Sequence, residues 1–211
     1  MICIGSTGDV RPYLVLGREL RRRGHEVSIC AFATFESAVR AEGLGFRPVS
    51  GDVKTFMANL MNGANGVAFL KQVRDTMREF IEPFLADLEA ATEGAQAIIG
   101  TYFGQVFQSL AEMRRVPYVQ THYFPIDPNP QAPIASAPGQ RVGKAWNLAT
   151  YQLGHLLIST LEKYYLSDWR QSRGMSPRKL EAAPSYELCG HLIPVLYAIS
   201  PLIMPRPARW G

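Results

Sequence analysis

The chain has 211 residues, of which 47% are hydrophobic and 19% charged, and this composition is typical of a packed globular domain rather than a disordered segment. The net charge is +4 at pH 7, but no stripe of basic and aromatic residues accompanies it, so we expect no nucleic-acid partner. The three cysteines are too few and too widely spaced for a disulfide framework, which favours a reducing, cytoplasmic location. The apolar stretches are interrupted before they reach the ~20 residues of a membrane span. The triplet Arg21-Arg22-Arg23 remains a candidate contact for anionic lipid headgroups at a membrane surface.

The first residues predict a strand, a loop, a helix and a second strand. An apolar run at 1–4 is followed by a glycine-containing loop, and Pro12 suits the first turn of a helix because its missing N–H leaves nothing unpaired there. Gly24 suits the left-handed position after the helix end. Residues 25–32 are typical of a buried strand. This order opens a doubly wound sheet.

The same alternation continues along the chain. Further helices are predicted at 35–42, at 54–93 as two helices separated near Gly63 and Gly66, at 104–115, and at 147–173 with a mild break at Gly154, and further strands at 46–49, 95–102, 117–124 and 195–200. Residues 125–143 contain five prolines and have no period, which is typical of a binding loop or a disordered one. The alternation predicts an α/β, Rossmann-like doubly wound fold whose mostly parallel sheet has helices on both faces. We expect residues 1–200 to form one domain and residues 201–211 to begin a linker.

Ligands of such sheets bind beyond the carboxyl ends of the strands, so the loops that follow the strands are expected to converge on one cleft. Four aromatic residues lie in these loops: Tyr102, Phe103, Tyr123 and Phe124. Aromatic residues are usually part of a core. If these four line the cleft, the acceptor that they bind is flat and apolar.

Asp9 is the first candidate for chemistry. Its loop lacks the spacing of the dinucleotide fingerprint and places a carboxylate where a phosphate would lie, so phosphate binding by this loop is not expected. One interpretation of Asp9 is a helix N-cap. The other is a general base at a strand-to-helix mouth that accepts a proton from a bound hydroxyl.

His122 is the second candidate, at the end of the strand predicted at 117–124. One interpretation is a histidine that is hydrogen-bonded at a strand end, and the other is an acceptor contact or an assisting base. No histidine, cysteine and aspartate cluster with metal-ligand spacing occurs in the sequence, so no metal site is expected.

Two segments near the start resemble the opening of the GT-B glycosyltransferases. They are residues 5–12, Gly-Ser-Thr-Gly-Asp-Val-Arg-Pro, and, after a leucine-rich helix, residues 23–27, Arg-Gly-His-Glu-Val. The branch that they resemble contains the sterol glucosyltransferases and the glycopeptide-antibiotic glycosyltransferases. Residues 41–48 and 199–210 also fit this branch, so the resemblance spans essentially the whole chain, although the middle matches in layout only.

The resemblance implies the N-terminal, acceptor-binding half of a GT-B fold. A C-terminal domain, in cis or on a separate chain, would bind the nucleotide sugar, a UDP- or TDP-hexose. Asp9 matches the aspartate regarded as the general base of that branch, and Thr7 and Gly8 beside it would contact a hydrophobic small-molecule acceptor. The family's donor-binding signature does not occur in residues 1–211, so we expect no cofactor in this chain and no activity from it alone.

Three hypotheses therefore remain open from the sequence. The first is the acceptor half of an inverting glycosyltransferase. The second is a stand-alone binding or regulatory module for a hydrophobic small molecule, without catalysis. The third is a truncated product without function.

Overall fold

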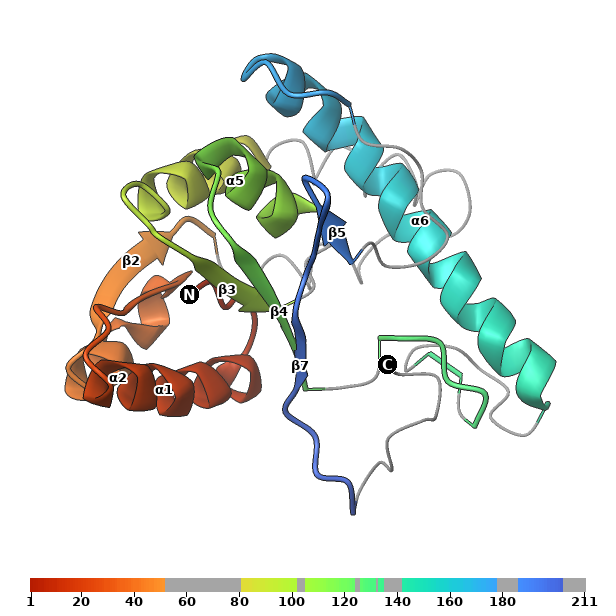
Figure 1. The fold of residues 1–211 in the computed structure, drawn as a ribbon, viewed down its shortest axis with the longest axis horizontal. Coiled ribbons are helices and arrows are strands. Elements are labelled where there is room, and N and C mark those ends of the chain that lie inside the picture. The colour runs from red at the N-terminus through yellow and green to blue at the C-terminus, as the bar shows by residue number, and fades with distance from the viewer. Residues whose placement is uncertain are drawn as a thin grey trace. The chain divides into compact units, whose positions relative to one another are not determined.

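The computed structural model describes most of the chain (Figure 1): residues 1–51, 81–101, 105–123, 126–131, 133–134, 142–177 and 186–202. They belong to two compact units. The first unit contains residues 1–101 and 114–116, and the second contains residues 102–113 and 117–211. The two helices predicted around Gly63 and Gly66, and most of the predicted linker, lie outside the described residues.

The first unit is built from short parallel strands and helices. Its elements are α1 (Thr7–Arg22), β1 (Ser28–Phe32), the 3-10 turn η1 (Ala33–Phe35), α2 (Glu36–Ala41), β2 (Gly45–Val49), a helical segment at 81–91 and β3 (Ile98–Thr101). β1 pairs with β2 in parallel, from Ser28 opposite Gly45 to Phe32 opposite Val49. The strand predicted at 1–4 is reduced to parallel bridges from Ile2 to Cys30 and to Gly100. The parallel α/β arrangement expected from the sequence is confirmed.

The ends of α1 differ in how well they were predicted. At its C-terminus, Gly24 follows the C-cap residue with φ of +90°, as expected of a left-handed stop. At its N-terminus, the helix begins at Thr7 instead of near Pro12, so Pro12 lies inside the helix and the first-turn prediction was wrong. The earlier start follows from capping contacts of Ser6 and Asp9, described below.

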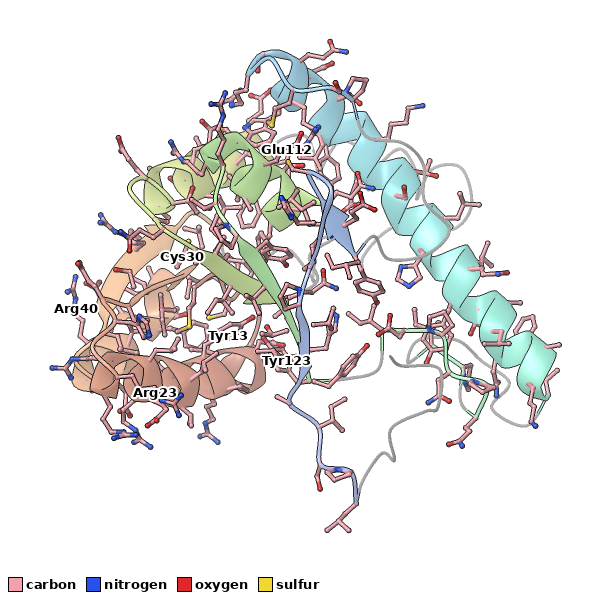
Figure 2. All side chains as sticks on the ribbon, in the orientation of Figure 1. Tyr13, Arg23, Cys30, Arg40, Glu112 and Tyr123 are labelled. Carbon is pink, nitrogen blue, oxygen red and sulfur yellow. The ribbon has the colours of Figure 1, made fainter. Side chains whose placement is uncertain are left out.

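The core of the first unit is formed by buried residues from both its strands and its helices: Ile2, Cys3, Ile29, Cys30, Val39, Phe84, Leu88 and Ile98. Figure 2 shows Cys30 inside this unit and Arg23 and Arg40 at its surface. Burial raises the pKa of the Cys3 and Cys30 thiols to about 12. Both cysteines are therefore core residues, as predicted.

The second unit contains a second parallel pair and the longest helix. Its elements are α5 (Val106–Arg114), β4 (Tyr118–His122), α6 (Lys144–Gln171), β5 (Glu187–Leu188), β6 (His191–Leu192) and β7 (Val195–Tyr197). β4 and β7 pair in parallel, with Gln120 opposite Val195 and His122 opposite Tyr197. β5 and β6 form an antiparallel hairpin that was not predicted from the sequence. The hairpin turns at the exposed Cys189 and at Gly190, both with positive φ.

α6 runs without interruption through Gly154, so the predicted break there was wrong (Figure 1). A Cβ at position 154 would lie 3.1 Å from the Ile134 side chain, so the glycine leaves room for a close neighbour instead of interrupting the helix.

Arg170, near the end of α6, is 2% exposed. Its guanidinium donates to Ser109 Oγ of α5 at 2.7 Å and forms an ion pair with Glu112 of α5 at 2.9 Å. Within the described part of the chain, no helix has the length and apolar character needed to cross a membrane.

Candidate functional site

The turn before α1 holds Asp9 in a fixed position. Ser6 is the N-cap residue and Asp9 is the third residue of the helix, so the interpretation of Asp9 as the N-cap itself was wrong. Asp9 Oδ2 accepts hydrogen bonds from the Ser6 backbone N–H at 2.6 Å and from Ser6 Oγ at 2.9 Å. This is the carboxylate half of a capping box, with aspartate in the place of the usual glutamate.

Gly5 makes this arrangement sterically possible. A Cβ at position 5 would lie 2.3 Å from Asp9 Oδ2 and 2.5 Å from its Cγ, far inside van der Waals contact. The first glycine of the loop therefore leaves the volume that the carboxylate occupies. The sequence motif showed that a glycine stood here but did not show which side chain required it.

The turn leaves part of the carboxylate accessible. Thr7 and Gly8 are exposed and Asp9 is half-buried. Both Ser6 bonds end on Oδ2, and no bond to Oδ1 is found among the described residues. Asp9 thus has one oxygen for positioning and one available to accept a proton from a neighbouring hydroxyl.

His122 lies in the second unit, at the end of β4, and is 1% exposed. Its Nε2 is 2.9 Å from the Gln120 amide nitrogen, an arrangement that suits a neutral ring with its proton on Nδ1. Burial, together with a smaller effect of the nearby His155, lowers the pKa of His122 to about 4. The imidazole is therefore neutral at pH 7 and has the properties of a hydrogen-bonded histidine at a strand end.

A second carboxylate lies in the same unit as His122. The Tyr197 ring is 5.0 Å from the His122 ring, and the Tyr197 hydroxyl donates to Asp127 Oδ2. Burial raises the pKa of Asp127, and the bond from Tyr197 opposes that rise. His155 Nε2 lies 3.3 Å from the Ile126 carbonyl oxygen. No role was predicted for Asp127, His155 or Tyr197, because they come from the segment after β4, from α6 and from β7, and no local pattern shows that these elements meet near His122.

The predicted site residues thus fall into three groups. Thr7, Gly8 and Asp9 lie together in one turn of the first unit. His122 and the half-buried Tyr123 follow each other at the end of β4 in the second unit (Figure 2). Tyr102, Phe103 and Phe124 lie outside the described residues. Across the described residues, no group of three or more histidine, cysteine, aspartate or glutamate side chains is placed to hold a metal ion.

Similar proteins of known fold share this architecture. The chain is similar to SsfS6, a glycosyltransferase of Streptomyces sp. SF2575, with a TM-score of 0.55 and 17% identity over 97% of this chain and 51% of that one. It is also similar to CalG4, the calicheamicin glycosyltransferase, with a TM-score of 0.54 and 17% identity over 83% of this chain and 43% of that one. These likenesses show the fold, the Rossmann-like N-terminal half of a GT-B glycosyltransferase.

Curated relatives align along nearly the whole chain. The sterol 3-beta-glucosyltransferase of Aspergillus fumigatus is 30% identical over 98% of this chain, and that of Debaryomyces hansenii is 28% identical over 97%. The chain spans only 14% and 13% of those two proteins. The model of the glycosyltransferase family 28 N-terminal domain matches residues 1–128, which include both the Asp9 turn and the end of β4. The chain therefore belongs to the glycosyltransferase family 28 N-terminal domain family.

Proposed function

We propose that this chain is the acceptor-binding half of an inverting glycosyltransferase. It would present a hydrophobic aglycone, such as a sterol, a lipid or a polyketide or peptide natural product, to a UDP- or TDP-hexose. The sterol 3-beta-glucosyltransferases among its relatives support such an acceptor, and a structure of SsfS6 complexed with thymidine diphosphate supports a nucleotide-sugar donor. Residues 1–200 would form this half. The donor would be held by a C-terminal domain, joined through a linker that begins at residues 201–211 or provided by a separate chain.

The observation that carries the proposal is the fixed carboxylate of Asp9. The acceptor hydroxyl oxygen attacks the anomeric carbon on the face opposite the nucleoside diphosphate, forming one C–O bond as the bond to the diphosphate breaks. Asp9 Oδ1 accepts the hydroxyl proton while Oδ2 stays bonded to Ser6. The diphosphate leaves with the bonding electrons, and a β-glycoside results from an α-linked donor.

The other predicted residues would bind the acceptor. Thr7 and Gly8 are exposed beside Asp9 and would orient the acceptor hydroxyl. Tyr102, Phe103, Tyr123 and Phe124 would provide flat apolar contacts for the aglycone. His122 is buried and neutral, so we assign it a supporting contact beneath the acceptor rather than the role of base.

The test is Asp9→Asn in the enzyme that joins this chain to its nucleotide-sugar domain. Asparagine keeps an oxygen for the Ser6 N–H but cannot take a proton, so we expect kcat to fall by about 10²–10⁴-fold with little change in KM. Glu36→Gln, at an exposed carboxylate of α2, is the matched control and should retain activity. Near wild-type kcat for Asp9→Asn would overturn the assignment. Aglycone binding without turnover, in every pairing with a donor domain, would instead favour the binding-module hypothesis.

We propose a cytoplasmic location for this chain. All three cysteines are free, which supports a cytoplasmic protein. The arginine triplet is a weak candidate for a membrane contact, because Arg22 and Arg23 already form ion pairs with Glu19 at 2.8 Å.

A further inference from the structure

The first turn of α5 is capped by a side chain of α6. The Gln105 carbonyl oxygen accepts a helical hydrogen bond from the Ser109 N–H at 2.9 Å, so Gln105 is the N-cap residue of α5. The Gln105 N–H donates to Glu162 Oε1 at 2.8 Å, across 57 residues of sequence. In a capping box, the third residue of the same helix makes this contact. Here a glutamate of another helix makes it.

Glu162 is buried, and only 2% of it is exposed. Removing a carboxylate from water is unfavourable unless hydrogen bonds and opposite charge replace the water. The Gln105 N–H and the partial positive charge at the N-terminus of α5 provide such contacts. The Gln105 side chain, 3% exposed, adds a buried amide nitrogen that has no hydrogen-bond partner within the described part of the chain. Polar groups buried in this way are typical of a place where position matters more than stability.

Gln105 directly follows a segment that carries two of the residues proposed to bind the acceptor. Tyr102 and Phe103 precede it by three and two positions in the sequence. The Gln105 backbone is therefore the anchored point that follows these two aromatic residues along the chain. Glu162 is too deeply buried to contact an acceptor itself, so it can act on acceptor binding only through Gln105.

We propose that Glu162 is a positioning residue for acceptor recognition. Its carboxylate holds the Gln105 backbone at the start of α5, and this contact determines how Tyr102 and Phe103 are presented to the aglycone. The inference rests on the proposed function, because it requires those two aromatic residues to bind the acceptor. It does not involve the chemistry of Asp9.

Glu112 provides a matched control on the same pair of helices. It pairs with Arg170 of α6 at 2.9 Å and lies seven residues after Gln105, about two helical turns away. Glu112→Gln and Glu162→Gln each remove one carboxylate charge between α5 and α6. Both should weaken the packing of the two helices, but only the Glu162 substitution should alter acceptor binding.

The test is steady-state kinetics of the enzyme that joins this chain to its nucleotide-sugar domain, with cholesterol as the acceptor. For Glu162→Leu we expect the acceptor KM to rise about tenfold, because the charged hydrogen bond to Gln105 is lost, while kcat and the donor KM stay within about twofold. Glu162→Gln keeps an oxygen for the N–H and should raise the acceptor KM about threefold, so it tests the proposal even if the leucine variant does not fold. Glu112→Gln should keep the wild-type acceptor KM.

Hydrogen exchange of the 211-residue chain, without substrates, tests the contact separately from catalysis. The Gln105 N–H should exchange at least about tenfold faster in Glu162→Leu than in Glu112→Gln. Equal exchange in the two variants would overturn the proposal. So would an unchanged acceptor KM, or a loss confined to kcat, when the wild type is active. A wild type that transfers no sugar to cholesterol would instead refute the proposed sterol acceptor, and this role of Glu162 with it.

Discussion

The Arg170 guanidinium and the Glu112 carboxylate meet through two parallel contacts, Nη1 to Oε2 at 2.9 Å and Nη2 to Oε1 at 3.1 Å. The pair joins α6 to α5 across 58 residues of sequence. Arg170 is 2% exposed, and its remaining donors bond to Ser109 Oγ and to the Ser176 carbonyl oxygen, each at 2.7 Å. A buried guanidinium whose donors are satisfied in this way holds two helices in one register.

Removing this arginine should therefore destabilise the second unit strongly. For Arg170→Met we expect the free energy of unfolding to fall by about 2–4 kcal/mol, because the buried Ser109 hydroxyl and the partly exposed Glu112 carboxylate lose their partner. Arg40→Met is the matched control, since Arg40 pairs with Glu36 at 2.7 Å on the surface, and it should cost at most about 0.5 kcal/mol. Urea unfolding followed by circular dichroism measures both variants. Equal losses would show that the buried pair contributes no more than an exposed one.

Gly5 and Gly8 should respond differently to the same substitution. Gly5→Ala places a methyl group 2.3 Å from Asp9 Oδ2, so Asp9 must move and about 1–3 kcal/mol of stability should be lost. Gly8→Ala meets nothing nearer than Ser6 Oγ at 3.7 Å, and an alanine in a helix should stabilise the chain by about 0.5–1 kcal/mol. Thermal unfolding of the two variants provides the comparison. A neutral Gly5→Ala would mean that the turn accommodates the methyl group without displacing the carboxylate.

His122 should make the chain sensitive to mild acid. Its pKa is about 4 in the fold and about 6.5 in an unfolded chain, so the unfolded state binds the extra proton between these values. The free energy of unfolding should therefore fall as the pH decreases from 6.5 to 4. About 2 kcal/mol of this fall should be complete when the pH reaches 5. His122→Gln should reduce this loss. The loss should not vanish, because burial also lowers the pKa of His155.

The control for that measurement is His191→Gln, at an exposed histidine of β6, which should follow the wild-type pH dependence. Urea unfolding at pH 7 and at pH 5 is sufficient for all three proteins. An unchanged difference between the two pH values in His122→Gln would contradict a buried neutral imidazole.

Tyr197 of β7 should hold Asp127, near the start of the proline-rich residues 125–143, through hydrogen bonds. Tyr197→Phe removes the bond to the Asp127 carboxylate and the contact of the Asp127 N–H with the hydroxyl oxygen at 3.3 Å. We expect a loss of about 2 kcal/mol and faster hydrogen exchange around residues 126–131. Tyr186→Phe is the matched control, since within the described part of the chain the Tyr186 hydroxyl has no hydrogen-bond partner, and this variant should be neutral. Equal exchange in both variants would contradict the tether.

The sequence predicted best where structure depends on local chemistry. Gly24 was predicted as a helix stop, and it follows α1 with φ of +90°. The helix and strand alternation was predicted because periodicity reports which face of an element is buried. The role of Asp9 as a general base stays a prediction.

What the sequence did not predict depends on contacts between distant residues. Gly154 has the composition of a helix break, but Ile134 packs against it and the helix continues. In the sequence, Arg170 is indistinguishable from an ordinary surface arginine, because no residue close to it in the chain indicates that Glu112 is its partner. The pairing of Tyr197 with His122 requires β7 to lie beside β4, which no local pattern encodes.

The distribution of the cysteines makes the chain convenient for spectroscopy. Cys3 and Cys30 are buried with thiols that resist ionisation, whereas Cys189 is exposed at the turn of the β5–β6 hairpin. The accessible thiolate adds to the double bond of a maleimide, so a fluorophore or spin label should attach at Cys189 alone without any cysteine of this chain being removed. The chain therefore carries one addressable reporter on its second unit, from which distances to an engineered label in the first unit can be measured in solution.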